Sequence, residues 1–170
     1  ELLDKKDVSN ICEINAALSE NSDFKTLPYY HCIILAKNLV GLRNLYELIS
    51  KSCLECFYKK PRIPKSLLQA KREGLIIGSA CEAGELYRAI AEGKSDEEIL
   101  KIASFYDYLE IQPCGNNEYM IRSEKFPNVN SIEDIQNFNR KVIHIGDALG
   151  KPVVATCDVH FLDPGDAKYR

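Results

Sequence analysis

Four short runs of apolar, mostly β-branched residues are spaced along the chain, and longer amphipathic segments separate them. The runs predict β-strands at residues 32–36, 75–78, 108–112 and 152–156. Strands that are apolar almost throughout are typical of a sheet that is covered on its outer face.

Helical periodicity fills the segments between the strands. It predicts helices at residues 39–57, 82–91, 97–105 and 131–149. Ser95 and Glu98 form a capping box ahead of the third of these helices. Ser131 is the expected N-cap of the fourth, and Gly150 its stop. Residues 7–18 fit one short helix, and residues 125–130 fit a loop.

Strands that alternate with helices predict parallel β/α units, so the expected fold class is α/β. Four strands are few for a closed barrel. A small open sheet and a part of a larger barrel therefore stay open as alternatives, and no internal repeat chooses between them. The chain opens on Glu-Leu-Leu without a methionine, which suggests a piece cut from something longer.

Composition narrows the class of protein. The 170 residues are enough for one domain with a core, and no apolar run approaches the length of a membrane span. A domain that binds DNA over a broad face is usually basic, so the net charge of −3 does not support direct binding of nucleic acid. A small group of basic residues is most simply interpreted as a solvated loop; it consists of Lys59, Lys60, Arg62 and Lys65.

The seven cysteines are odd in number and irregular in spacing, and the chain shows no secretory signal. Free thiols in a reducing cytosol are therefore expected, and with them a cytoplasmic location. Cys53 and Cys56 form a C-x-x-C, but no second pair supplies the other half of a zinc site.

The last apolar run ends in a polar cluster that contains Asp158 and His160. On an extended backbone, residues two positions apart point to the same side, so these two side chains can face one point just past a buried strand. In α/β folds this rim is where ligands and metals bind.

Three further residues could take part in chemistry. Cys81 follows the second run, where it is either a ligand or a small residue in a tight turn. His31 precedes the first run beside two tyrosines. It is either a ligand or a half-buried residue whose hydrogen bonds are satisfied within the protein. Glu110 lies inside the third run, so it is either directed at the site or held in a salt bridge, and we favour the salt bridge. His144 is expected at a helix surface or at the edge of the core.

Together, Cys81, Asp158, His160 and His31 make a mixed set of nitrogen, oxygen and sulfur donors. Such a set suits zinc, iron or manganese better than calcium or magnesium. The chain contains no nucleophile-elbow, phosphate-loop or dinucleotide-binding glycine motif.

The amino-acid sequences of five segments, taken in order, resemble those of a known family. The segments are 30–38 (YHCIILAKN), 61–64 (PRIP), 74–86 (GLIIGSACEAGEL), 106–113 (YDYLEIQP) and 153–162 (VVATCDVHFL). They resemble the PHP (polymerase and histidinol phosphatase) domain of C-family replicative DNA polymerases, most closely the PolC-type alpha subunit of DNA polymerase III. The resemblance covers about residues 28–170.

The resemblance implies a partial, distorted (β/α)7 barrel with parallel strands and a trinuclear metal site at its C-terminal rim. His31, Cys81, Asp158 and His160 match family metal ligands, whereas the H-x-H motif and the other early ligands are not in this chain. Residues 1–26 resemble the segment that follows an inserted exonuclease, and residues 27–170 resemble the C-terminal part of the PHP domain. The implied cofactor is a divalent metal (Zn, Mn or Fe) in the complete domain, and whether this fragment alone binds one stays open.

The resemblance also implies a role. The favoured role is a metal-binding structural scaffold within a DNA-directed DNA polymerase that also has a 3′–5′ exonuclease. The alternative is a metal-dependent phosphoesterase or pyrophosphatase, in which Asp158 and His160 would be catalytic through the metals that they hold. Polymerase and exonuclease activity are not expected of this fragment alone. The implied partners are the rest of the polymerase chain and, through the full protein and not mainly this segment, DNA; no membrane is involved. An open barrel edge also predicts self-association.

Overall fold

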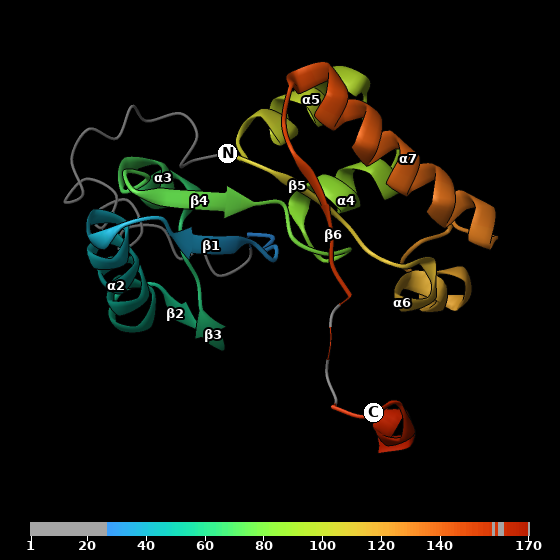
Figure 1. Cartoon of the computed structure of the whole chain (residues 1–170), viewed down its shortest axis with the longest axis horizontal. Coiled ribbons are helices and arrows are strands. Elements are labelled where there is room, and N and C mark those ends of the chain that lie inside the picture. The colour runs from blue at the N-terminus through green and yellow to red at the C-terminus, as the bar shows by residue number, and fades with distance from the viewer. Residues whose placement is uncertain (1–26, 158, 160–161, 170) are drawn as a thin grey trace. The chain divides into compact units, whose positions relative to one another are not determined.

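The computed structural model describes residues 27–157, 159 and 162–169, in which helices and short strands alternate as a mixed α/β structure (Figure 1). In chain order the elements are β1 (Ile33–Ala36), α2 (Leu39–Leu54), β2 (Phe57–Tyr58), β3 (Lys60–Pro61), α3 (Lys65–Ala70), β4 (Leu75–Gly78), α4 (Glu85–Ala91), α5 (Asp96–Ser104), β5 (Leu109–Ile111), α6 (Cys114–Asn117), η2 (Glu118–Arg122), α7 (Ile132–Leu149), β6 (Val153–Ala155) and η3 (Pro164–Tyr169). The helix expected at residues 7–18 lies outside the described residues.

The chain divides into two compact units, which are described one at a time. The first unit contains the residues up to Tyr30 and Ile34–Ile77, and the second contains His31–Ile33 and the residues from Gly78 onward. Each of the four predicted strands is present inside its predicted range as β1, β4, β5 and β6. The described strands form three separate two-stranded sheets, and no closed barrel is seen among them.

In the first unit, α2 ends three residues earlier than its apolar pattern predicted. Phe57 belongs to β2, which pairs antiparallel with β3 through the partners Phe57–Pro61 and Tyr58–Lys60. Lys59 forms the turn between them with φ of 60°. The basic residues expected in a solvated loop therefore lie on an ordered hairpin and at the start of α3, although Lys59 and Lys60 are exposed as expected.

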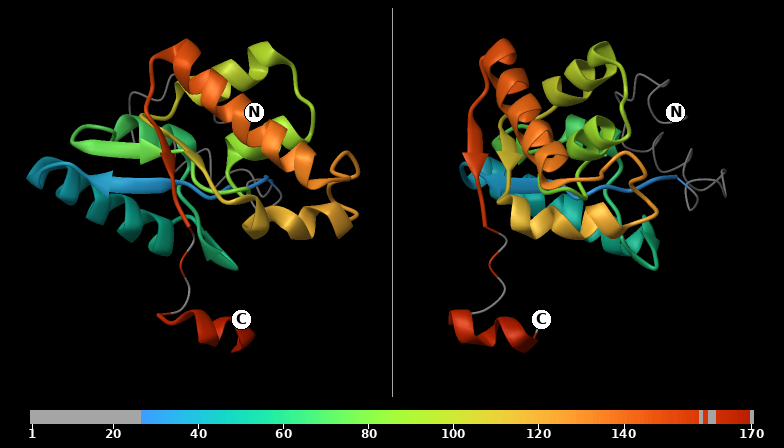
Figure 2. Two further views of the ribbon diagram at one scale, coloured as in Figure 1. Left: turned by 45° about the vertical axis from the view of Figure 1, so that its right-hand side comes forward. Right: turned by 90° about the vertical axis from the view of Figure 1, so that its right-hand side faces the viewer.

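The parallel arrangement expected for all strands is wrong for β1 and β4. These two strands are neighbours in one sheet, and Figure 1 and Figure 2 show their arrows pointing in opposite directions. The backbone N–H of Lys37 donates to the Gly74 carbonyl at one end of the pair. A single crossover helix returns the chain to a parallel strand. Here two helices and a hairpin lie between β1 and β4. The chain therefore enters β4 at the end of the sheet where β1 finishes, and the two strands run antiparallel.

In the second unit, β5 and β6 pair in parallel, as predicted, with Glu110 opposite Val154. Figure 2 shows α4, α5 and α7 on one side of this pair. Helices on one face agree with the expected covering of the sheet, but the expectation that the final strand is buried is wrong, because Val154 keeps 37% of its surface exposed.

The core of the second unit lies between α4, η2 and α7. Tyr87, Met120 and Ile135 are buried there in one cluster. The Tyr87 ring packs edge-on against Phe138 with 5.9 Å between ring centroids, and its hydroxyl accepts a hydrogen bond from the Asn117 amide. In the described part of the chain, none of the helices is both long and apolar enough to span a bilayer.

The helix boundaries follow the predicted capping residues. Ser95 and Glu98 form the expected capping box of α5, and Ser131 forms one with Asp134 at the start of α7. Gly150 ends α7 in the left-handed conformation, with φ of 62°. The next residue, Lys151, donates from its ammonium group to carbonyls at the C-terminal end of α5, which fixes the chain where it enters β6.

A close approach of two backbones in the first unit yields a test. Gly41 is buried in α2, and a Cβ atom there would lie 1.7 Å from the Gly74 carbonyl oxygen. Gly41→Ala should lower the free energy of unfolding by about 1–3 kcal/mol, because backbone must shift to admit the methyl group. Urea unfolding followed by circular dichroism measures this loss.

Gly115→Ala is the matched control, because nothing lies within 4 Å of a Cβ at that exposed helical position. This variant should be unchanged or slightly more stable, since alanine favours helix. Equal stability of the two variants would contradict the close packing of α2 on the Gly74 turn.

Candidate metal centre

His31 and Cys81 lie together in the second unit, although 50 positions separate them in the sequence. His31 precedes β1 and forms a parallel bridge with Gly84, in which its N–H donates to the Ala83 carbonyl at 3.0 Å. Cys81 lies in the turn after β4, which is closed by a bond from the Gly84 N–H to the Cys81 carbonyl at 2.9 Å. The Cys81 Sγ and the His31 Nδ1 are 3.4 Å apart.

This turn changes the expected environment of the thiol. The helix predicted to begin at Glu82 begins at Glu85, so Cys81 is not at a helix N-terminus. Burial, reinforced by the negative charge of Glu82, raises the pKa of Cys81 to about 11. The thiol is therefore protonated at neutral pH unless a cation replaces the proton. From the sequence, a helix beginning at Glu82 would have favoured the thiolate form of Cys81 through its N-terminus; the later start at Glu85 removes that effect.

Glu82 has a partner in the same region. Its carboxylate accepts a hydrogen bond of 3.0 Å from the Tyr119 hydroxyl. Burial, together with the charge of Glu82, raises the pKa of Tyr119 to about 12, so Tyr119 remains a donor at neutral pH. Glu82 is thus held toward η2 rather than in the first turn of α4.

The two described donors fit a metal ion of the predicted type. A tetrahedral ion bound at about 2.3 Å from sulfur and about 2.0 Å from nitrogen keeps these two atoms roughly 3.5 Å apart. The observed 3.4 Å separation therefore needs little adjustment. His31 is exposed and Cys81 half-buried, which leaves an approach for an ion from solvent.

The remaining predicted ligands, Asp158 and His160, lie outside the described residues. Among the residues that the structure does describe, no group of three or more histidine, cysteine or acidic side chains is arranged so that it could hold a metal ion. Two of the four predicted ligands are therefore brought together, and the other two stay a prediction.

The chain that leads to Asp158 is held from several directions. The Thr156 N–H donates to the Ile111 carbonyl at 3.1 Å, which continues the β5–β6 ladder by one residue. The Asn116 side-chain amide donates to the Cys157 carbonyl, also at 3.1 Å. The sequence gave no reason to select Asn116, because its role depends on where α6 lies.

Glu110 supplies the third point of attachment. Its carboxylate is buried and accepts a hydrogen bond of 2.6 Å from the Thr156 hydroxyl, and a longer one from the Gln112 amide. Its backbone N–H donates to the Ser79 hydroxyl at 2.9 Å. Within the described part of the chain its side-chain partners are neutral donors, so the expected salt bridge is wrong there.

The other cysteines and histidine agree with the simpler expectations. All six described cysteines are free thiols. Cys53 is exposed near the end of α2, whereas Cys56 is buried beyond it. His144 is exposed on α7.

Comparison with known proteins gives one consistent result. The family model described as "PHP domain" matches residues 6–113. The whole chain is 51% identical to part of a PolC-type DNA polymerase III from Clostridium perfringens and 43% identical to part of one from Thermotoga maritima. Over 92% of its length it is 52% identical to another from Caldanaerobacter subterraneus. The chain spans only 11–12% of the length of these relatives.

The buried bond between Thr156 and Glu110 can be tested directly. Thr156→Val keeps the shape but leaves the buried carboxylate without its shortest hydrogen bond, so the free energy of unfolding should fall by about 1–3 kcal/mol. Thr156→Ser retains the hydroxyl and should lose clearly less. Chemical denaturation of both variants measures the difference, and a valine variant as stable as the parent would exclude a structural role for this bond.

Proposed function

The chain belongs to the PHP domain family, and from this premise we propose that it is a metal-binding structural scaffold within a bacterial replicative DNA polymerase III of PolC type. The observation that supports the proposal is the 3.4 Å approach of Cys81 Sγ to His31 Nδ1. A metal bound there would connect the segment before β1 to the turn after β4. Because it would bind the folded state only, it would stabilise that state by mass action.

We assign the ligands as His31, Cys81, Asp158 and His160, and the metal as zinc, manganese or iron. The described donors are one imidazole nitrogen and one thiol sulfur, which suit these ions better than calcium or magnesium. When bound, the ion would supply a fixed positive charge that replaces the thiol proton of Cys81. The chain's own contribution is to hold both donors in place through the Ala83 and Gly84 backbone.

The finer architecture follows as part of the same proposal. Residues 27–170 would form the C-terminal part of a distorted (β/α)7 PHP barrel, and residues 1–26 the segment after an exonuclease insertion. The partners would be the polymerase and exonuclease domains of the same chain, through which the whole protein acts on DNA in the bacterial cytoplasm.

Metal binding and stability test the scaffold role together. The chain, freed of metal with a chelator, should gain thermal stability when zinc or manganese is added. At an ion concentration a hundred times the dissociation constant the gain is about 2.7 kcal/mol. For a domain of this size it corresponds to a rise in Tm of about 5–10 °C. Differential scanning calorimetry and elemental analysis of the dialysed protein measure both quantities.

Two variants should reduce both the metal-induced rise in Tm and the amount of bound metal: Cys81→Ser and Asp158→Asn. Cys53→Ser is the control, because it changes an exposed thiol outside the site, and it should reduce neither. Loss of the rise in Cys53→Ser as well would mean that metal binds thiols unselectively. An unchanged rise in Cys81→Ser would remove Cys81 from the site.

The same proteins distinguish the phosphoesterase alternative. In metal-loaded form they can be assayed with bis-p-nitrophenyl phosphate. The scaffold role predicts no hydrolysis above buffer. Hydrolysis that disappears in Asp158→Asn would replace the scaffold role with metal-dependent phosphoester cleavage.

We further infer that the isolated chain self-associates through β6. This strand pairs with β5 on one side, and no other strand among the described residues pairs with it. Val154 is exposed on it, and an unpaired apolar strand edge recruits other strands. Sedimentation velocity should show a concentration-dependent dimer that Val154→Lys weakens. A monomer at all concentrations would contradict this inference.

A further inference from the structure

The hairpin of β2 and β3 concentrates positive charge in a chain that is acidic overall. Residues 56–72 contain six of the 22 basic side chains and none of the 25 acidic ones. Three of the six lie on α3 or after it, namely Lys65, Lys71 and Arg72. Lys71 pairs with Glu47, and Arg72 donates to Gln69. The other three, Lys59, Lys60 and Arg62, lie on the hairpin or directly after it.

Three of these cations are stacked on aromatic rings. The Lys60 ammonium lies 4.0 Å from the centre of the Tyr29 ring, and the Arg62 guanidinium lies 4.6 Å from the same centre. Arg62 also lies 5.2 Å from the centre of the Tyr58 ring, and Lys59 lies 5.5 Å from it. We call these three cations and two tyrosines the basic hairpin. The rings hold the long side chains in place without neutralising their charge.

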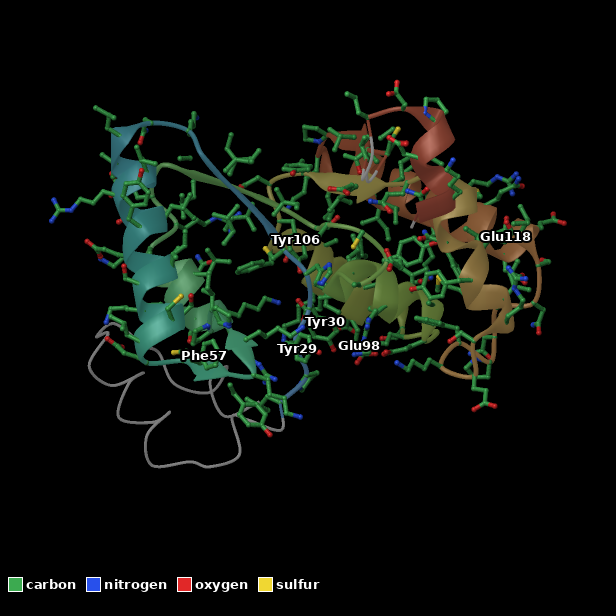
Figure 3. The ribbon with its side chains drawn as sticks, turned by 90° about the horizontal axis from the view of Figure 1, so that it is seen from below. Tyr29, Tyr30, Phe57, Glu98, Tyr106 and Glu118 are labelled. Atoms are coloured by element: carbon green, nitrogen blue, oxygen red, sulfur yellow. The ribbon has the colours of Figure 1, made fainter. Side chains whose placement is uncertain are left out.

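Lys59 and Lys60 are exposed, and no described carboxylate forms an ion pair with either. Flat apolar surface adjoins them: Tyr29 is 48% exposed and Phe57 is 55% exposed. Figure 3 shows Tyr29 and Phe57 at the same end of the unit, beside the hairpin.

The backbone at Lys59 is a second, independent observation. Its φ of 60° is a left-handed conformation that glycine or asparagine adopts at lower cost than lysine. Lys59 is exposed, and its ammonium lies over the Tyr58 ring. A strained backbone conformation that is kept at an exposed, charged residue points to a use for the side chain itself.

We propose that the basic hairpin binds the phosphodiester backbone of single-stranded nucleic acid. Cations held beside an exposed aromatic ring suit such a strand, since phosphates pair with Lys59 and Lys60 and a base stacks on Phe57, which is 55% exposed. An acidic polypeptide would use the cations but has no need of the aromatic faces. The negative net charge argues against a broad contact with nucleic acid, but it does not exclude a contact of two or three phosphates.

The test measures binding of fluorescein-labelled (dT)20 to the chain by fluorescence anisotropy. A chelator is present throughout, so the result does not depend on the proposed metal. With Lys59 and Lys60 each contacting one phosphate, a plot of log K against log salt concentration should have a slope of about −1.4 for a single strand. Lys59→Gln/Lys60→Gln should weaken binding about tenfold at low salt and make that slope shallower.

Lys101→Gln/Lys125→Gln is the matched control, because it removes the same charge from exposed positions elsewhere. It should leave binding within twofold of the parent. Equal losses in the two double variants would mean that overall charge alone attracts the oligonucleotide, and would overturn the proposal. Tight binding of polyglutamate that displaces the oligonucleotide would also overturn it in favour of an acidic protein partner.

Lys59→Gly separates the charge from the backbone strain. It should bind (dT)20 as weakly as the single variant Lys59→Gln while its Tm is no lower than that of the parent. Binding equal to that of the parent would show that Lys59 makes no contact with phosphate and would overturn its assigned role.

Discussion

The buried carboxylate of Glu110 is the constraint on which the arrangement of the second unit depends. A carboxylate that loses water must receive hydrogen bonds from the protein. Its shortest bond comes from Thr156, on the strand next to it, and its own backbone is bonded to Ser79 in the turn after β4. Three segments from distant parts of the sequence are thus joined at one point. A shift of one residue in the β5–β6 register would turn the Thr156 side chain to the other face of the sheet and break this connection.

The hydrogen bonds of Glu110 also determine where the candidate metal centre lies. Ser79 precedes Cys81 by two residues, and Thr156 precedes Asp158 by two. Both predicted ligands therefore follow directly from backbone that the Glu110 network holds. His31 is positioned separately, through the Ala83 carbonyl and the bridge to Gly84. A metal would add a connection between segments that the protein already holds close together, which is consistent with a stabilising role for the ion.

Local signals were sufficient to predict most of the fold. The strands follow from apolar runs, and the capping box at Ser95 and the N-cap at Ser131 follow from residues close together in the sequence. The hairpin was missed because strands of two residues carry no periodic pattern, and the apolar residues of α2 continue into Phe57 without a break. The direction of β1 relative to β4 depends on how many elements lie between them, and the missed α3 changed that number.

Prediction of the site was limited in the same way. His31 and Cys81 could be selected together because each stands at the end of an apolar run and both matched one family pattern. The partners of Glu110 could not be predicted, because Thr156 and Gln112 reach it only in one strand register. Sequence reasoning supplied a cation as the usual partner of a buried acid, whereas two neutral donors satisfy it here.

The net charge of the chain does not describe how its charges are distributed. A value of −3 averages over the whole chain, whereas a bound phosphate is affected mainly by charges within about 10 Å. The cations at residues 59, 60 and 62 became a distinct surface only when the β2–β3 pairing placed them beside Tyr58 and when Tyr29 packed against them. Tyr29 lies about 30 residues earlier in the chain. Its contact with Lys60 and Arg62 is thus a tertiary feature, and a linear charge pattern contains no sign of it. The sum of the charges therefore does not show where cations gather on the folded chain, whereas their ordered aromatic partners do.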